Sequence, residues 1–190
     1  MNIKGILFDF FGVICSEVAE PWFEKHGSGM TYQEFRDNHI YPYDAGKVSD
    51  AETWAVLARI SGQSEEEVKK QWVALAVVDM AVVDYARKLA STYQIALITN
   101  AGADFFWSIL DANNIRDLFP IIVVSSEEKI VKPDPRIYEI ALARMGLPPE
   151  AVLFIDDRKA NLEGARSLGI QALEFSTLSQ LRQDISQFGK

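Results

Sequence analysis

The chain has 190 residues, of which 48% are hydrophobic and 24% are charged, and its formal net charge at pH 7 is −8. This length suits one compact domain, or a core with a modest insertion, and it can bury a core without disulfides or a structural metal. The acidic balance argues against non-specific binding to nucleic acid or to a membrane surface, because both need a basic protein surface.

A single cysteine, Cys15, excludes an internal disulfide and favours a reducing compartment. The apolar stretch at the start is too short for a signal peptide. No apolar run approaches the roughly 20 residues that cross a bilayer. The sequence therefore predicts a cytoplasmic protein.

The first predicted element is the apolar run GILF at residues 5–8, which has strand character and stops at Asp9. The stretch that follows, residues 16–79, contains no strand-like run. It carries three S/T-x-x-E patterns typical of capping boxes: Thr31 with Glu34, Ser49 with Glu52, and Ser64 with Glu67. We interpret residues 16–79 as a small helical insertion after the first strand. Most of its aromatic and histidine side chains are expected to form its own core, and a few to line a cleft: Trp22, His26, Phe35, His39, Tyr41 and Tyr43.

Beyond residue 80, apolar runs alternate with helical patterns. The runs are IALI before Thr99, IIVV before Ser125, AVLFI before Asp156, and a weaker strand, IQALEF. Helices are expected over residues 134–146 and 158–169, each ending at a glycine suited to a C-terminal cap, and from about residue 177. Continuous apolar runs suit strands covered on both faces, so residues 1–15 and 80–190 predict a doubly wound α/β sheet.

Polar residues follow these runs, and ligands bind beyond the carboxyl ends of parallel strands. One shared site is therefore expected for Asp9, Thr99 with Asn100, and Asp156 with Asp157, joined by Lys132 if the loop EEKIVKPDP folds back. Taken singly, these residues also suit helix caps, a strand end facing water and an ordinary loop lysine. Their joint placement favours the site.

The residue types indicate a chemistry. Three crowded carboxylates repel one another unless a hard cation lies among them, and oxygen ligands suit Mg²⁺. A carboxylate can attack phosphorus, while a cation, a hydroxyl, backbone amides and a lysine bind the phosphate oxygens. The sequence predicts a magnesium-dependent phosphoryl-transfer site with an aspartate nucleophile.

The sequence resembles the haloacid dehalogenase superfamily over its whole length. ILFDFFGVI is similar to motif I, with Asp9 as the nucleophile, and LITNAG to motif II, with Thr99 as the phosphate-binding hydroxyl. VKPDPRIY, with Lys132, is similar to motif III, and FIDDRKANLEGARSLG to motif IV. The insertion resembles the small helical cap of this family. Within it, AGKVSDAETWAVLA is similar to the branch of glucose-1-phosphate phosphatases and the phosphatase domain of soluble epoxide hydrolase.

The resemblance implies a Rossmann-like core with a helical cap, and a Mg²⁺-dependent phosphatase of small phosphorylated metabolites such as sugar phosphates. It implies that an aspartyl-phosphate forms on Asp9. The implied metal ligands are Asp9, the backbone carbonyl of Phe11 and Asp157, with Asp156 orienting water or Lys132. The implied phosphate-binding residues are Thr99, Asn100 and Lys132.

Phe11 departs from the family pattern, which usually has a second aspartate there as general acid and base. Losing such a group typically costs about 10²–10⁴-fold in rate. The change is compatible with a phosphatase for substrates with good leaving groups, in which a cap residue, His39 or Asp44, could assist. It is also compatible with a metal-independent 2-haloacid dehalogenase, although the acidic pair in FIDDRKAN argues against that, and with a catalytically weak binding or regulatory protein. We predict the phosphatase.

Overall fold

The protein, described here from a computed structural model covering residues 3–27 and 29–188, is built on a sheet of five parallel strands in the order β3-β2-β1-β4-β5. The strands are β1 (Gly5–Phe8), β2 (Gln94–Thr99), β3 (Ile121–Val124), β4 (Val152–Asp156) and β5 (Gln171–Glu174). Each lies on one of the apolar runs, which confirms the predicted doubly wound α/β class. The strand order reverses beside β1, so the crevice expected of such sheets lies at the carboxyl ends of β1 and β4.

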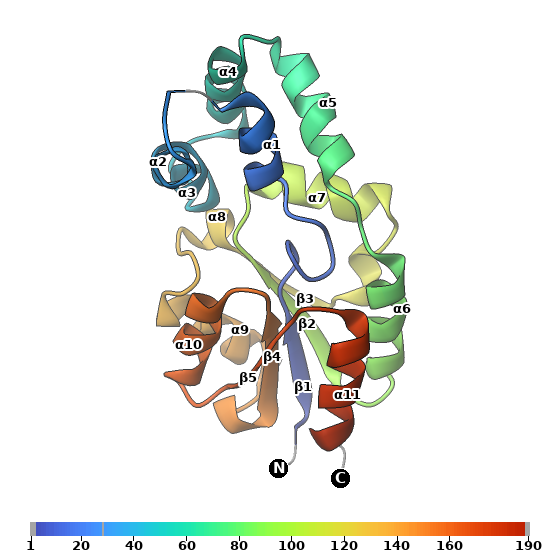
Figure 1. The fold of residues 1–190 in the computed structure, drawn as a ribbon. Helices are drawn as coiled ribbons and strands as arrows, with labels where there is room; N and C mark the ends of the chain where they lie inside the picture. Colours follow the sequence, from blue (N-terminus) through green and yellow to red (C-terminus); the bar gives the residue numbers. More distant parts are fainter. Residues whose placement is uncertain (1–2, 28, 189–190) are drawn as a thin grey trace.

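Helices cover both faces of the sheet (Figure 1). On one face, α9 (Pro135–Met145) and α10 (Lys159–Arg166) pack over the completely buried Leu7. Side chains of α6 (Met80–Leu89), α7 (Ala103–Ala112) and α11 (Leu178–Phe188) form the core on the other face, with Ile6 and Phe8. Because both faces are covered there, the interior residues of β1, β2 and β4 are apolar without alternation, whereas the edge strand β5 is partly exposed and carries Gln171 and Glu174.

Short elements complete the core, and both predicted glycine caps formed. The short elements are η2 (Arg116–Leu118), α8 (Ser125–Glu128) and η3 (Pro149–Ala151). Helix α9 begins at a proline and ends at Gly146 in the left-handed conformation, as expected. Helix α10 has Arg166 as its last helical residue, and a tightened turn leads from there to the predicted cap at Gly169, which is also left-handed, with φ +86°. The Gly169 N–H donates to the Arg166 carbonyl at 2.9 Å, and the Ile170 N–H donates to the Ala165 carbonyl at 3.3 Å, the two bonds of a Schellman cap.

The described residues of the insertion form helices joined by short loops, with no strand among them. The insertion comprises α1 (Ala19–His26), α2 (Tyr32–Phe35), the π-helical turn η1 (Arg36–Ile40), α3 (Tyr41–Asp44), α4 (Asp50–Ser61) and α5 (Glu65–Leu75). Two of the three predicted capping boxes are complete, those of Thr31 and Ser49. At α5 only the Ser64 hydroxyl accepts a bond, from the Glu67 N–H, while the Glu67 carboxylate accepts from Gln71 instead. The prediction of a complete capping box at Ser64 was therefore wrong in one of its two hydrogen bonds, the one from the Ser64 N–H to the Glu67 carboxylate.

The insertion leaves and rejoins the core at one place. The Ser16 N–H donates to the Val77 carbonyl at 3.0 Å, and the Asp79 N–H donates to the Ile14 carbonyl at 2.8 Å. Helices α1 to α5 consequently stand together beyond the carboxyl ends of the strands (Figure 1). Trp22 and Phe35 are buried in the interior of the insertion with their rings 5.9 Å apart, as expected of core residues.

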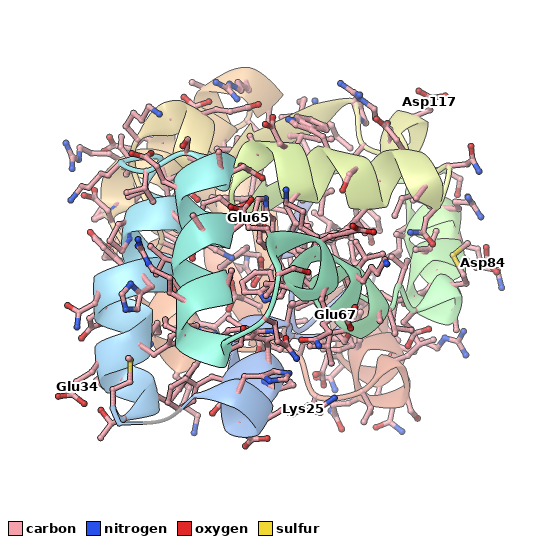
Figure 2. The ribbon with its side chains drawn as sticks, turned by 90° about the horizontal axis from the view of Figure 1, so that it is seen from above. Lys25, Glu34, Glu65, Glu67, Asp84 and Asp117 are labelled. Atoms are coloured by element: carbon pink, nitrogen blue, oxygen red, sulfur yellow. The ribbon has the colours of Figure 1, made fainter. Side chains whose placement is uncertain are left out.

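The outer surface of the insertion carries several exposed acidic side chains. Figure 2 looks down on it and shows Glu34 from α2 and Glu65 and Glu67 from α5, all of which are exposed. None of the helices in the described part of the chain is both long and apolar enough to traverse a lipid bilayer.

Candidate active site

Two aspartates meet at the reversal point of the sheet. Asp9 directly follows β1, and Asp156 is the last residue of the neighbouring strand β4. The register pairs Phe8 with Ile155, and the Asp9 N–H donates to the Ile155 carbonyl at 2.9 Å. Both carboxylates are buried, with exposures of 4% and 0%. The parallel register therefore brings together residues almost 150 positions apart in the chain, as the sequence predicted.

Lys132 lies between these carboxylates. Its Nζ is 2.6 Å from Asp9 Oδ1 and 2.7 Å from Asp156 Oδ2, and the side chain is buried. Burial lowers the pKa of this amine, but the charges of Asp156 and Asp9 outweigh burial and raise the pKa overall. The lysine thus stays charged inside the protein, as expected of a group that binds anionic oxygens.

Asn100 holds the loop that carries Lys132. Its side-chain oxygen accepts from the Lys132 N–H at 2.8 Å, and its Nδ2 donates to the Lys132 carbonyl at 3.0 Å. This pair of bonds explains why the loop after β3 folds back to the ends of β1 and β4. Asn100 also lines the cavity described below.

Asp156 is the most fully bonded carboxylate of the site. Besides Lys132, it accepts from the Arg158 N–H at 2.8 Å and from Asn161 Nδ2 at 3.0 Å through both oxygens. Burial raises the pKa of Asp156, but Lys132 and these hydrogen bonds outweigh burial and lower the pKa overall. Sequence reasoning gave Asn161 no role, although its place in the motif IV pattern was the available signal.

The pKa values of Asp9 and Asp157 are shifted in the opposite direction from that of Asp156. Burial first, and then the charge of Asp156, raise the pKa of Asp9 well above its ordinary value, although Lys132 opposes both. Burial and the same neighbour raise the pKa of Asp157 to about 6. Oxygen atoms of the three carboxylates lie within 4.8 Å of one another. Such crowding is relieved when a cation lies among the oxygens.

Two further oxygen atoms suit a hard cation. Among the described residues, Asp157 Oδ1 is buried without a hydrogen-bond partner, and no group donates to the Phe11 carbonyl. The loop passes close over Asp157 only because residue 12 is glycine: its φ is +87°, and a Cβ there would lie 2.5 Å from Asp157 Oδ2. The donor set fits Mg²⁺, which prefers carboxylate and carbonyl oxygens.

The sequence-predicted hydroxyl, Thr99, lies at the end of β2. It is completely buried, and its Oγ1 has no hydrogen-bond partner among the described residues. The loop that follows is fixed by Ser125, whose Oγ accepts from the Ala101 N–H at 3.0 Å. An unpartnered buried hydroxyl is costly unless a ligand satisfies it, which is consistent with its predicted role.

A cavity of about 280 Å³ separates this group from the insertion. Such a volume suits a small metabolite. Its lining combines residues of the core, Asp9, Phe11, Asn100, Phe105, Lys132 and Arg158 among them, with residues of the insertion, including Tyr32, Arg36, Tyr41, Tyr43, Asp44 and Trp72.

Phe11 forms part of this lining and offers no titratable group. Its ring is half-buried, stacked parallel to Phe105 at 6.3 Å and edge-on to Phe10 at 5.0 Å. The side chain is therefore held by packing beside the site and contributes no proton to it.

The Lys132 pairs also bear on stability. Replacing Lys132 with methionine should lower the free energy of unfolding at pH 8 by about 3–5 kcal/mol, because two buried carboxylates lose their cation. Urea unfolding measures the change, and Lys88→Met, at an exposed position of α6, is the matched control that should shift it by less than about 0.5 kcal/mol. Equal stabilities of the two variants would contradict the ion-paired geometry.

Comparison with known proteins agrees with the sequence resemblance. A family model described as haloacid dehalogenase-like hydrolase matches residues 3–169. The D-ribitol-5-phosphate phosphatase of Bacteroides thetaiotaomicron is 24% identical over 200 residues, covering 97% of each chain. The phosphorylated carbohydrates phosphatase of Thermotoga maritima is 35% identical over 175 residues, 91% of this chain and 78% of that protein. Shorter matches span less than half of the relative, among them mouse acyl-CoA dehydrogenase family member 10 and (S)-2-haloacid dehalogenase 4A of Burkholderia cepacia, at 6% and 36%.

Solved structures share the fold. The enzyme bt-2542 of the same family, from Bacteroides thetaiotaomicron, solved as a magnesium complex, superposes with a TM-score of 0.80 at 25% identity. The match covers 95% of this chain and 98% of that one.

Proposed function

This chain belongs to the haloacid dehalogenase-like hydrolases, and on that premise we propose that it is a magnesium-dependent phosphatase of small phosphorylated metabolites. The observation that carries the proposal is the buried group of Asp9, Lys132 and Asp156, with Asp157 beside it, at a cavity of about 280 Å³. The printed names of two relatives, which act on D-ribitol 5-phosphate and on phosphorylated carbohydrates, support phosphorylated sugars or polyols as the substrate class.

The metal would be held by Asp9, Asp157 and the carbonyl oxygen of Phe11. Bound Mg²⁺ supplies positive charge that neutralises phosphoryl oxygens and the crowded carboxylates. Asp156, whose oxygens are already engaged by Lys132 and Asn161, serves instead to orient Lys132.

Asp9 is the proposed nucleophile. Its carboxylate attacks phosphorus, the bond to the leaving oxygen breaks, and an aspartyl-phosphate forms, which water then hydrolyses. Thr99, Asn100 and Lys132 bind the transferring phosphoryl group, and the fixed positions of their loops keep those donors oriented throughout. Among them, Lys132 contributes a full positive charge at a buried position.

Residues 1–15 and 80–190 form the proposed catalytic core, and residues 16–79 the proposed cap. Support comes from the single place at which the insertion leaves and rejoins the core. The cap residues that line the cavity, such as Tyr41 and Tyr43, would set specificity.

Metal removal tests the proposal. The purified protein should release phosphate from p-nitrophenyl phosphate, glucose 1-phosphate or D-ribitol 5-phosphate in Mg²⁺, lose that activity in EDTA, and regain it when Mg²⁺ is restored. Phosphate and p-nitrophenol release are measured under all three conditions. Activity that is indifferent to EDTA would contradict a magnesium-dependent reaction.

Chloride release from 2-chloropropionate tests the alternative function, a metal-independent 2-haloacid dehalogenase. The aromatic residue at position 11 and the dehalogenases among the relatives favour a 2-haloacid dehalogenase, which needs no metal. Metal-independent chloride release without phosphatase activity would move the protein to that class. Silence in both assays, from a folded protein that binds Mg²⁺ in calorimetry, would favour a binding role.

A further inference from the structure

The cap places a carboxyl group without a partner on the wall of the active-site cavity. Asp44, the last residue of α3, lines the cavity together with Asp9 and Lys132. Among the described residues, its carboxylate makes no hydrogen bond and no ion pair within 4 Å, although the residue is half-buried. A half-buried polar group without a protein partner is free to bond a ligand.

The backbone of Asp44 is tied to the loop that carries the proposed phosphate-binding residues. Its carbonyl accepts from Ser125 Oγ at 2.5 Å, and the same Oγ accepts from the Ala101 N–H at 3.0 Å. Two residues on, the Gly46 carbonyl accepts from Lys129 Nζ at 2.8 Å. These bonds between cap and core fix where the Asp44 side chain enters the cavity, so its position does not depend on packing within the cap alone.

The surroundings of this carboxyl raise its pKa, so that a large fraction stays protonated at neutral pH. Burial, and then the charge of Glu17, raise the pKa of Asp44 to about 7, against the opposing charges of Arg158, Lys132 and Arg36. A general acid works best when its pKa is near the operating pH. His39, the other candidate from the sequence, packs its ring 5.8 Å from that of Phe35 and does not contribute to the lining of the cavity.

We propose that Asp44 is the general acid and base of this phosphatase, supplying from the cap the proton transfer that Phe11 cannot provide. The inference rests on the proposed function. In the first half-reaction, Asp9 bonds to phosphorus, the phosphorus–oxygen bond of the substrate breaks, and the Asp44 proton passes to the departing oxygen, releasing an alcohol. In the second, the Asp44 carboxylate takes a proton from water as that water bonds to phosphorus and the bond between phosphorus and the Asp9 oxygen breaks. Phosphate is released, Asp9 is again a carboxylate, and Asp44 is again protonated.

Leaving-group dependence tests the inference. Asp44→Asn should lower kcat/KM by about 100-fold or more on alkyl phosphates such as D-ribitol 5-phosphate. On p-nitrophenyl phosphate, whose leaving group departs without a proton, kcat/KM should change by less than about fivefold, because this ratio reports the first half-reaction. The kcat of Asp44→Asn on p-nitrophenyl phosphate should fall, because hydrolysis of the aspartyl-phosphate by water then lacks a base. The first turnover should therefore release a burst of p-nitrophenol.

Two companion variants separate catalysis from structure. Glu66→Gln, at an exposed cap carboxyl that pairs with Lys70 at 3.0 Å and lies outside the lining of the cavity, should leave the rates on both substrates unchanged. The double variant Phe11→Asp with Asp44→Asn should regain at least tenfold on alkyl phosphates, because a carboxyl returns to the site. Asp44→Ser provides a second substitution should the first be poorly folded. Equal losses of kcat/KM on both substrates, or no loss on either, would overturn the assignment.

The pH dependence gives a readout that a merely structural residue would not move. For alkyl phosphates, kcat/KM should fall as the pH rises above about 7, because the acid form of Asp44 is lost; Asp44→Asn should lack this limb.

The pH dependence of the thermal midpoint checks the raised pKa of Asp44 independently of activity. The pKa of this carboxyl rises on folding from about 4 to about 7, so its ionisation destabilises the folded wild type increasingly as the pH rises through that range. Asparagine does not ionise, so the thermal midpoint of Asp44→Asn, relative to that of wild type, should increase between about pH 4 and 7.

Failure of this inference differs from failure of the proposed function. If wild type is active with Mg²⁺ and Asp44→Asn has unchanged kcat/KM on every substrate, only the role of Asp44 is overturned. A wild type without phosphatase activity would overturn both.

Discussion

Asp9→Asn should reduce phosphatase activity by at least about 10⁴-fold, because the amide oxygen cannot attack phosphorus to form the aspartyl-phosphate. The variant should nevertheless fold. Asparagine is the same size as aspartate, and burial together with Asp156 already disfavours the charge at this position. Steady-state rates on p-nitrophenyl phosphate with saturating Mg²⁺ give the loss, and circular dichroism with a thermal melt gives the state of the fold.

The matched control for this prediction is Asp84→Asn. Asp84 is an exposed carboxylate on α6 that pairs with Arg87, and its charge is removed by the same atomic change (Figure 2). This variant should retain wild-type rates. Full activity of Asp9→Asn would refute Asp9 as the nucleophile, whatever the outcome for Asp44.

Phe11→Asp, made in the Asp44→Asn background where the cap supplies no proton, should raise kcat/KM on alkyl phosphates by about 10-fold to 100-fold, and should do so more than on p-nitrophenyl phosphate. The physical reason is that a carboxyl beside the reacting group protonates a poor leaving group, whereas an activated one gains little. The substitution removes the ring packed on Phe105 and Phe10, so some loss of stability is expected with the gain in rate.

The comparison with Phe11→Asn isolates proton transfer from the change in shape. Asparagine has nearly the volume of aspartate but no ionisable proton, so it should not give the gain on alkyl phosphates. Gains that are equal for the two substrates, or equal for the two variants, would mean that residue 11 does not reach the leaving oxygen.

Much of the fold and of the site could be predicted from local pattern. The four continuous apolar runs became β1 to β4, because strands covered on both faces must be apolar throughout. The polar residues after those runs, Asp9, Thr99 and Asp156, share one end of the sheet because parallel strands all point the same way. The insertion was recognisable from its capping patterns, of which those at Thr31 and Ser49 formed completely.

Other features depended on contacts between distant parts of the chain. The return of Lys132 to the site is held by two bonds to Asn100, 32 residues away. The support that Asn161 gives to Asp156 is local, since the two residues are five positions apart, and the motif IV pattern was the signal that could have found it. The glycine pattern, by contrast, placed the cap of α10 correctly at Gly169, because that cap depends only on residues within about one helical turn.

The sequence by itself determined the fold class, the family and the set of polar residues at the sheet edge, because each of these follows from short patterns and their order. Only the tertiary structure decided which side chains of the cap face the cavity. Trp22 and Phe35 pack inward, whereas Tyr41 and Asp44 line the cavity. That choice rests on how helices from separate stretches pack on one another and bond to the core at Ser125, and such long-range contacts leave no periodic signal in the chain.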